Sequence, residues 1–194
     1  MQLEYGKGFL EISVEEKRIL SLLQPKEVKG MERVEERVEE RVEERVRESL
    51  EKPIGSPSLL EILGGKKKVL ILTVNFTRPS PRALISPIAE LCEKMKREVT
   101  ILIARGRHRP MTQEEIRNHL GDDLVNRYPI LEHDPFDENV HREIGKTSRG
   151  VPIRVNKAIF ENDVVIGTGM IEPSYLCGFS GGRKLLMPGI SHFR

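Results

Sequence analysis

The sequence predicts an α/β fold: a Rossmann-like, largely parallel sheet with helices on both faces, preceded by a strand or hairpin and a charged helix. Two continuous apolar runs, at 69–74 and 99–104, are typical of strands buried on both faces of a parallel sheet. Helix signals follow each run, and this alternation is the pattern of βαβ units. A further run at 163–167 adds the last clear strand.

Residue types at the segment ends place the helices. Ser80 and Pro81 are suited to begin a helix, which we expect to run to about residue 97. Residues 112–115 read Thr-Gln-Glu-Glu, the order of a helix-starting capping box, and Gly121 is suited to end that helix. Weaker patterns predict strands at 129–133 and 151–155 and a short helix at 156–162.

We expect three parts along the chain. Residues 1–30 form a strand or hairpin, with Gly6 and Gly8 at the turn, that packs on the main domain. Residues 31–52 are a charged helical insertion, and residues 53–194 form an α/β domain of catalytic type. The insertion repeats Val-Glu-Glu-Arg with a period of four, so its valines drift around a helix. This favours a solvated, ion-paired helix, with a coiled-coil or partner helix as the alternative.

Composition excludes several classes of protein. The 194 residues carry 32 basic and 30 acidic side chains, a net charge of only +2, and no Trp, which argues against a nucleic-acid platform. No apolar run reaches the length of a membrane span, and no signal peptide opens the chain. Cys92 and Cys177 show neither metal-site spacing nor a disulfide framework. We expect a cytoplasmic protein without membrane or nucleic-acid partners, and richness in Glu, Arg and Lys is typical of a thermophile.

The segment 178–189 has four glycines in twelve residues, with Gly181 and Gly182 directly before Arg183 and Lys184. Glycine lets a ligand approach the main chain closely, and exposed N–H groups beside a lysine suit an anion. The spacing is not that of a P-loop. The segment therefore predicts an anion or cofactor site, with a tight structural turn as the alternative.

Three loops leave the predicted strands at one edge of the sheet, at 75–79, 105–110 and 167–184, and the carboxyl edge is where open α/β sheets bind ligands. Arg78 is suited to hold a carboxylate or phosphate, or is a surface arginine. His108 lies between two arginines, which favour a neutral imidazole able to accept a proton, or it has no role. His133 and Asp134 form an acid–base pair or only a strand end.

His119 and His141 are expected on helix or hairpin surfaces without a role. Tyr175 and Cys177 are candidate pocket residues, although core packing is favoured for Cys177.

Several motifs together resemble the N-terminal domain of the lactate racemase family, in order and over about residues 2–191. They are Thr-Arg-Pro-Ser-Pro at 77–81, Gly-Arg-His-Arg-Pro-Met-Thr at 106–112, His-Asp at 133–134 and Gly-Phe-Ser-Gly-Gly-Arg-Lys at 178–184. Tyr-Gly at 5–6, Asn156 and Met-Pro-Gly at 187–189 add to the match. Residues 31–51 look like a lineage-specific expansion. The resemblance implies a nickel-pincer nucleotide as cofactor and a small, lactate-like 2-hydroxyacid whose stereoisomers are interconverted by hydride transfer.

The resemblance also assigns roles to residues of this chain. It implies that Lys184 joins the cofactor covalently and that Gly181 and Gly182 lie against its phosphate. Ser180 and Asn75 are further expected cofactor contacts. Arg78 would lie near the substrate carboxylate, and His108 would be one of two histidines that handle the hydroxyl proton.

The chain departs from the family pattern in three ways. Asn75 stands where the family usually has Asp, and Ser174 stands where it has the second catalytic histidine. The family's nickel-binding histidine and its C-terminal domain would follow Arg194, and His192 has the wrong spacing to be that ligand. We therefore expect a C-terminal domain or a separate chain to complete the site, and residues 1–194 alone to fold without racemising lactate. The alternatives are a non-catalytic nucleotide- or phosphate-binding module and an inactive fragment of the family.

Overall fold

The computed structural model describes residues 2–5, 8–18, 20–21, 38–174 and 178–193. The chain divides into two compact units, Met1–Glu35 and Glu36–Arg194. In the first unit β1 (Gln2–Tyr5) and β2 (Gly8–Glu11) pair antiparallel, with Tyr5 opposite Gly8, and the short 3-10 helix η1 (Glu16–Arg18) follows. The predicted hairpin is confirmed, although Gly6 lies outside the described residues. Its packing on the main domain stays a prediction.

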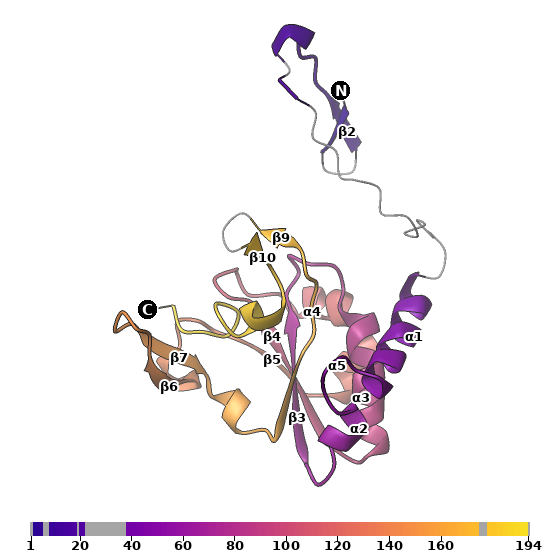
Figure 1. Cartoon of the computed structure of the whole chain (residues 1–194), viewed down its shortest axis with the longest axis vertical. Coiled ribbons are helices and arrows are strands. Elements are labelled where there is room, and N and C mark those ends of the chain that lie inside the picture. The colour runs from indigo at the N-terminus through magenta and orange to yellow at the C-terminus, as the bar shows by residue number, and fades with distance from the viewer. Residues whose placement is uncertain (1, 6–7, 19, 22–37, 175–177, 194) are drawn as a thin grey trace. The chain divides into compact units, whose positions relative to one another are not determined.

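The second unit is built on a four-stranded parallel sheet in the order β5-β4-β3-β8 (Figure 1). Its strands are β3 (Lys68–Val74), β4 (Glu98–Ala104), β5 (Ile130–Glu132) and β8 (Val164–Gly167). The apolar runs that predicted strands became the two central strands, which are buried along most of their length. The α/β fold with a parallel sheet is therefore confirmed.

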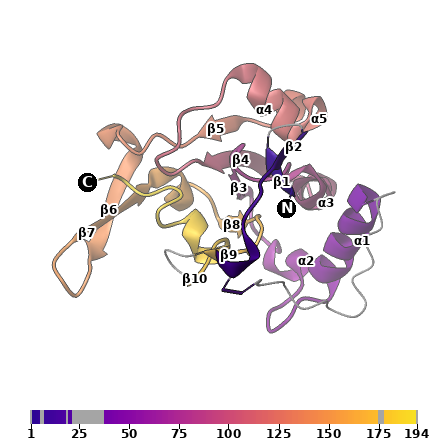
Figure 2. The same cartoon turned by 90° about the horizontal axis from the view of Figure 1, so that it is seen from above.

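The α-helices of the described residues, α1 to α5, lie on one side of this sheet (Figures 1 and 2). Alternate residues of the central strands, such as Val69, Ile71 and Ile101, pack into a core with side chains of α2 to α5. The helices are α1 (Val38–Glu51), α2 (Leu59–Ile62), α3 (Arg82–Lys94), α4 (Gln113–Leu120) and α5 (Asp122–Arg127).

The opposite face of the sheet carries shorter elements. Leu70, Leu72 and Leu102 pack there with Ala158 and Ile190 in a second, smaller core. Ala158 belongs to the 3-10 helix η3 (Lys157–Phe160), and Ile190 follows the 3-10 helix η4 (Gly182–Leu185). Helices thus cover both faces, as predicted, but the α-helices described here gather on one of them.

Helix ends follow the capping chemistry of the sequence. Thr112 accepts from the main-chain N–H of Glu115, and the Glu115 carboxylate accepts from that of Thr112, which completes the predicted capping box. Gly121 ends α4 with φ of 89°. Ser80 accepts from the N–H of Arg82 at the start of α3 and donates to the carbonyl of His119, which ties α3 to α4.

The charged helix α1 is not wholly solvated, so that part of the prediction is wrong. Val46 and Leu50 pack against the large core, and Arg47 pairs with Glu90 of α3 at 2.9 Å. Each step of four residues turns a helix by about 400°, so Val42, Val46 and Leu50 span only about 80°. Over three turns this drift is too small to carry them off the buried side. Residues 31–37 of the repeat lie outside the described residues.

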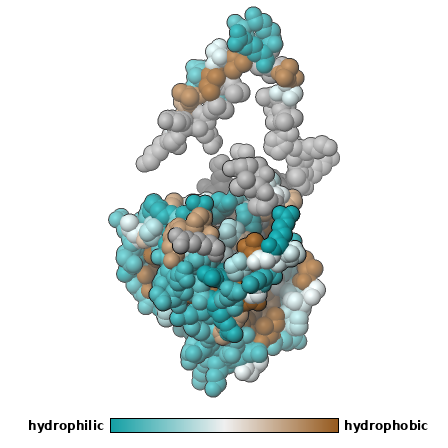
Figure 3. Space-filling model, turned by 90° about the vertical axis from the view of Figure 1, so that its left-hand side faces the viewer, coloured by the Kyte–Doolittle hydropathy of each residue, from teal (hydrophilic) through white to brown (hydrophobic). Residues whose placement is uncertain are grey.

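The remaining elements lie beside the sheet. β6 (His141–Lys146) and β7 (Pro152–Asn156) form an antiparallel hairpin after the 3-10 helix η2 (Glu138–Val140), and β9 (Pro173–Ser174) pairs with β10 (Gly178–Phe179). The surface on this side is largely hydrophilic, with apolar residues in small separate groups (Figure 3). Within the described part of the chain, no helix combines the length and apolarity needed to cross a bilayer.

Candidate functional site

A pocket of about 360 Å³ opens at the carboxyl edge of the sheet, where β3, β4 and β8 end. All three predicted loops contribute to it. It is lined by Val74, Asn75, Thr77, Arg78, Ala104, Arg105, Gly106, Arg107, His108, Met170, Ser180, Gly181, Lys184, Leu185, Pro188 and Gly189. Six of the eight residues singled out from the sequence thus lie around one cavity.

Main-chain hydrogen bonds join the 105–110 loop to the turn at Gly189 and close the 167–184 loop on itself. The N–H of Gly106 donates to the carbonyl of Gly189 over 2.9 Å, and the N–H of Ser180 donates to Glu172 over 2.8 Å. Gly181 has φ of 77°, and a Cβ there would lie 2.5 Å from the carbonyl oxygen of Met170. A Cβ on Gly189 would lie 2.2 Å from the Leu185 oxygen. These two glycines are therefore needed for the tight approach of the backbones that shape the pocket wall.

His108 is held by its neighbours at the cavity. Its Nδ1 lies 3.0 Å from Nδ2 of Asn75, and Asn75 is only 2% exposed. The Oδ1 of Asn75 accepts from the hydroxyl of Thr77 over 2.7 Å. The imidazole is thus oriented by a buried amide, which is itself oriented by Thr77.

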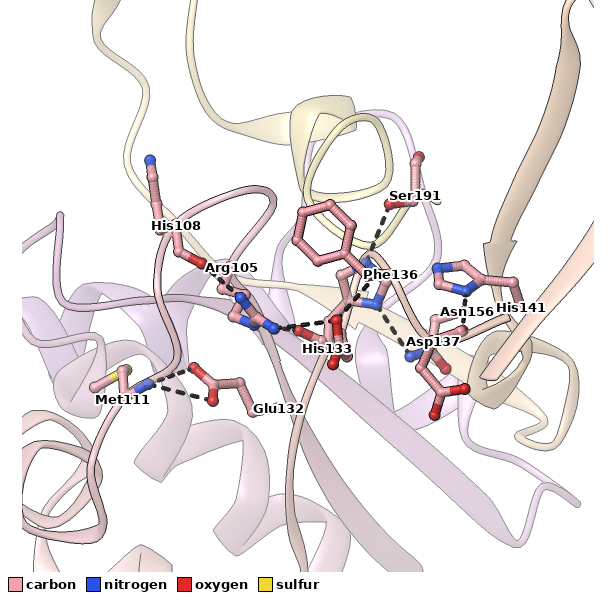
Figure 4. A network of polar contacts seen from close by, with 11 residues as sticks. Arg105, His108, Met111, Glu132, His133, Phe136, Asp137, His141, Asn156 and Ser191 are labelled. Carbon is pink, nitrogen blue, oxygen red and sulfur yellow. Dashed lines mark hydrogen bonds and ion pairs between the residues drawn. The ribbon is translucent and has the colours of Figure 1, made fainter. Parts of the chain in front are cut away.

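Arg105 is a functional residue that the sequence reasoning placed only in a loop. Its guanidinium is buried, with the residue 7% exposed, and Figure 4 shows it between His108 and His133. Nη1 donates to the main-chain carbonyl of His108 and Nε to that of His133, each over 2.6 Å. Nη2 lies 3.2 Å from the carboxylate of Asp134. The signal that identifies such a residue is a charged side chain directly after a buried strand, where it must find partners.

The cationic side chains of the pocket differ in their partners. Nε of Arg78 lies 2.8 Å from the Glu172 carboxylate, and the guanidinium of Arg107 lies over the Phe193 ring at 4.1 Å. Lys184 lines the cavity and takes part in none of the ion pairs found among the described residues. The Lys184 ammonium is therefore available to an anionic ligand.

Two predicted site residues do not line the cavity. Gly182 lies in η4 with φ of 53°, next to the wall that Gly181 forms. Ser174 is half-buried in β9, opposite Gly178, outside the cavity lining. Tyr175 and Cys177 lie outside the described residues. Cys92, the other cysteine, is a buried free thiol of α3 whose pKa burial raises to about 11.

His133 is fully buried, and both of its ring nitrogens have partners. Nε2 lies 3.1 Å from the Ser191 carbonyl, and Nδ1 lies 3.2 Å from Nδ2 of Asn156 (Figure 4). Burial lowers its pKa to about 4, so the ring is neutral near pH 7. Asp134 pairs with Arg105. Of the two sequence-based alternatives, the structure favours a structural histidine at the strand end.

The expectation of a surface position for His119 is wrong. It is buried, and its Nε2 lies 3.1 Å from the Val74 carbonyl, at the end of β3. Burial lowers its pKa. The helix pattern missed this because His119 lies on the face of α4 that packs against α3 and β3. His141 is half-buried, with its ring edge-on to those of His133 and His192.

Metal ligands do not gather in the described part of the chain. No group of three or more His, Cys, Asp or Glu side chains with the arrangement of a metal site occurs among those residues. The side chain of His192 is 4% exposed, packs edge-on against the ring of His141 and does not line the pocket.

The fold and the pocket define an α/β domain with a ligand-sized, cation-bearing site at the carboxyl edge of a parallel sheet. Its sequence matches the profile of the lactate racemase N-terminal domain over residues 5–194. The chain belongs to that family, and the resemblance seen in its motifs is confirmed.

Two curated relatives and two solved structures extend this finding. The chain is 38% identical over 150 residues to the lactate racemase of Lactiplantibacillus plantarum, covering 75% of this chain and 35% of that protein. It is 34% identical over 194 residues to the lactate racemase of Thermoanaerobacterium thermosaccharolyticum, covering 98% of this chain and 44% of that protein. The chain thus spans less than half the length of these relatives.

The structure of the lactate racemase apoprotein from the same Thermoanaerobacterium is similar with a TM-score of 0.81, over 98% of this chain and 43% of that one at 34% identity. A crystal structure of a Thermotoga maritima protein is similar with a TM-score of 0.65 at 27% identity. The match covers 79% of this chain and 38% of that one.

Proposed function

We propose that this chain is the cofactor-holding N-terminal domain of a lactate-racemase-like enzyme, which interconverts the stereoisomers of a small 2-hydroxyacid. One observation carries the proposal: Asn75, Arg78, His108, Ser180, Gly181 and Lys184, each given a role by the family resemblance, line one cavity. They come from three segments up to about a hundred residues apart in the sequence. A non-catalytic phosphate-binding module would need Gly181 and Lys184. It would not account for His108 in the cavity or for the Asn75 amide that orients the ring.

The residues present fit the phosphate-bearing part of a nickel-pincer nucleotide. The pocket volume of about 360 Å³ lies in the range of small-molecule sites. Lys184 would hold the group covalently, and Ser180 with the main chain at 181–182 would contact its phosphate. When bound, this group supplies a hydride acceptor and donor for the substrate carbon.

The chain's own polar residues would handle the substrate. Arg78 would bind the carboxylate, for which it must leave or share Glu172, and its planar guanidinium suits two-point contact with a carboxylate. His108 would contact the hydroxyl oxygen. Ser174 stands where the family has its second histidine, and Ser174 does not line the cavity. The second proton-handling group must therefore come from elsewhere.

Mass spectrometry tests the covalent role of Lys184. The chain is produced together with cofactor-building enzymes of the lactate racemase system, and intact and peptide masses are recorded. We expect a covalent adduct on the peptide that contains Lys184 and none in Lys184→Ala. The matched control is Lys157→Ala, an exposed lysine of η3 that should keep the adduct. A lactate racemase relative produced in the same way is the positive control. If that relative carries the cofactor adduct and this chain does not, the proposal is wrong.

Three further expectations belong to this proposal. The remaining part of the site would come from a C-terminal domain or a separate chain, since the relatives are more than twice as long as the matched region. The cytoplasmic location and the thermophilic origin inferred from composition also stay predictions.

A further inference from the structure

One wall of the pocket, the segment 188–191, is held by the ring of His133. Pro188 and Gly189 of this wall segment line the cavity. Nε2 of His133 lies 3.1 Å from the main-chain carbonyl of Ser191. A carbonyl oxygen only accepts, so the proton of this hydrogen bond is on Nε2. The ring therefore donates to the segment that forms one side of the pocket.

The partner of the other ring nitrogen fixes the charge of the ring. Nδ1 of His133 lies 3.2 Å from Nδ2 of Asn156. Oδ1 of the same amide accepts from the main-chain N–H of Ala158 over 3.0 Å, so turning the amide over would set its NH2 group against that N–H. Nδ1 therefore accepts from Asn156 and carries no proton. His133 is neutral, with its single proton on Nε2.

The main chain of His133 supports the loop that carries His108. Its carbonyl accepts from Nε of Arg105, whose Nη1 donates to the carbonyl of His108 (Figure 4). The wall segment reaches the same loop, because the N–H of Gly106 donates to the carbonyl of Gly189 over 2.9 Å. His133 thus supports this loop by two routes, one through its ring and one through its main chain. Together the contacts form a closed hydrogen-bond network, whose members are His133, Ser191, Gly189, Gly106 and Arg105.

A second proton on the ring is incompatible with this network. It must go to Nδ1, where it would face the N–H of the Asn156 amide. Turning the amide breaks its contact to Ala158, and turning the ring breaks the bond to Ser191. We propose that His133 is a positioning residue for His108: the neutral ring holds the wall segment 188–191 and the loop 105–108 together, and protonation of the ring releases both before the domain unfolds.

Two observations support a local release. Ile190 is the residue of the wall segment that packs in a core, and that core is the smaller one. Local opening of a weakly packed segment costs less free energy than global unfolding. The consequence for the reaction rests on the proposed function, because a released His108 would no longer be held against the substrate hydroxyl.

The surroundings of His133 do not compensate a charge on its ring. Burial lowers its pKa to about 4, and the neighbouring His141 and Arg105 lower it further. Asp134 acts in the opposite direction, but its carboxylate already pairs with Arg105 at 3.2 Å. The charged and titratable side chains around His133 and its neighbouring rings come from the ends of β4, β5 and β7, from η2 and β6, and from the C-terminal segment; they are Arg105, Asp134, Asp137, Glu138, His141, Arg154 and His192.

NMR of the histidine rings tests this coupling without cofactor or substrate. The chain is labelled with nitrogen-15 histidine and titrated from a pH of about 8 to about 3, which spans the ordinary imidazole pKa of about 6.5. Signals of His108 and His133 are assigned by their loss in His108→Gln and His133→Gln. We expect His133 to carry its proton on Nε2 at high pH. The His108 signals should show a step at the pH where His133 takes up its second proton, while circular dichroism still shows a folded domain.

Three variants separate the network from general stability. His133→Gln offers Ser191 a side-chain donor and does not titrate, so it should lose the step in the His108 signals. Asn156→Asp supplies a carboxylate that accepts from Nδ1–H, so the protonated ring keeps both partners; His133 should titrate at higher pH without a step at His108. Leu124→Ala, in the large core of α5, is the matched control, which lowers stability and should keep the step.

Three results would overturn the inference: a folded His133→Gln variant that keeps the step, an Asn156→Asp variant whose step moves with the pKa of His133, or wild-type signals that all vanish in one unfolding transition. If His133→Gln does not fold, the wild-type and Asn156→Asp titrations decide. Failure of the proposed function looks different, since it would remove the Lys184 adduct and leave these titrations unaltered.

Discussion

The guanidinium of Arg105 donates to the main-chain carbonyl of His108 over 2.6 Å, and through its Nε it donates to the carbonyl of His133 at the same distance. This one buried cation therefore joins the loop that carries the pocket histidine to the segment that follows β5. Both carbonyls lose their partner if the side chain is removed.

Arg105→Met should destabilise the fold by about 2–4 kcal/mol, because it leaves two carbonyls and Asp134 without their charged donor. Urea unfolding followed by circular dichroism measures this. Arg105→Lys should recover only part of the loss, since an ammonium lacks the planar fork. The control Arg107→Met removes a cation that lies over Phe193 and should cost at most about 1 kcal/mol. Equal losses of unfolding free energy in Arg105→Met and Arg107→Met would contradict this structural role of Arg105.

Glu172→Gln should strengthen the binding of carboxylate ligands, because it frees the Arg78 guanidinium from an ion pair of 2.8 Å. Half-exposed pairs are worth up to about 1 kcal/mol, so we expect a two- to fivefold lower Kd. Isothermal titration with lactate and with oxalate measures the change. Glu143→Gln, which pairs with Arg154 away from the cavity, should have no effect. Weaker binding by the Glu172 variant would mean that its carboxylate belongs to the ligand site.

Stability should fall as the pH is lowered from about 6.5 to 4. The pKa of His133 is about 4 in the folded chain and near 6.5 when unfolded, so the unfolded state binds more protons across this window. The contribution of neutral His133 to the free energy of unfolding is fully present above its pKa in the unfolded chain. It is lost as the pH falls toward the pKa in the folded chain, by an amount on the order of 3 kcal/mol. The lowered pKa values of His119 and His141 act in the same direction.

His133→Gln should flatten this pH dependence, because glutamine does not titrate. Urea unfolding of both proteins at several pH values between 7 and 4 gives the two slopes. Carboxylates contribute to both slopes equally, so the difference isolates His133. If unfolding free energy has the same slope against pH in both proteins, the burial of His133 does not cause the loss of stability in acid.

Leu50→Ala should destabilise the domain by about 1–2 kcal/mol, since Leu50 is half-buried against the core. Arg45→Ala, on the exposed side of the same helix, should change stability by less than about 0.5 kcal/mol. Deletion of residues 31–51 should lower stability and still leave a cooperative unfolding transition, because the sheet and α3 to α5 form most of the core. Loss of cooperativity would place α1 within the essential core.

Local chemistry decided which features the sequence could predict. The apolar runs of β3 and β4, the capping box at Thr112 and the glycines before Lys184 each act within a few residues. Because parallel strands end at one edge, those local features were enough to predict that Arg78, His108 and Lys184 share a pocket.

Other features depend on contacts between distant residues. The burial of His119 requires Val74, 45 positions earlier, and the role of Arg105 requires His133 and Asp134. The packing of Val46 and Leu50 requires α3. No pattern within the segment itself shows such partners. Ser174, given a role by the family resemblance, pairs with Gly178 in β9 and lies outside the lining.

The strand order β5-β4-β3-β8 has a consequence for which parts of the chain can vary. From β3 the chain builds outward to β4 and β5, and it later returns to add β8 on the opposite flank of β3. Such a reversal is a topological switch point, where neighbouring loops diverge and leave a crevice. The described residues of β5 contribute nothing to the lining. The β6–β7 hairpin also contributes nothing to the lining, so insertions at its tip can accumulate among homologues without reshaping the crevice, whereas length changes at 75–79 or 105–110 cannot.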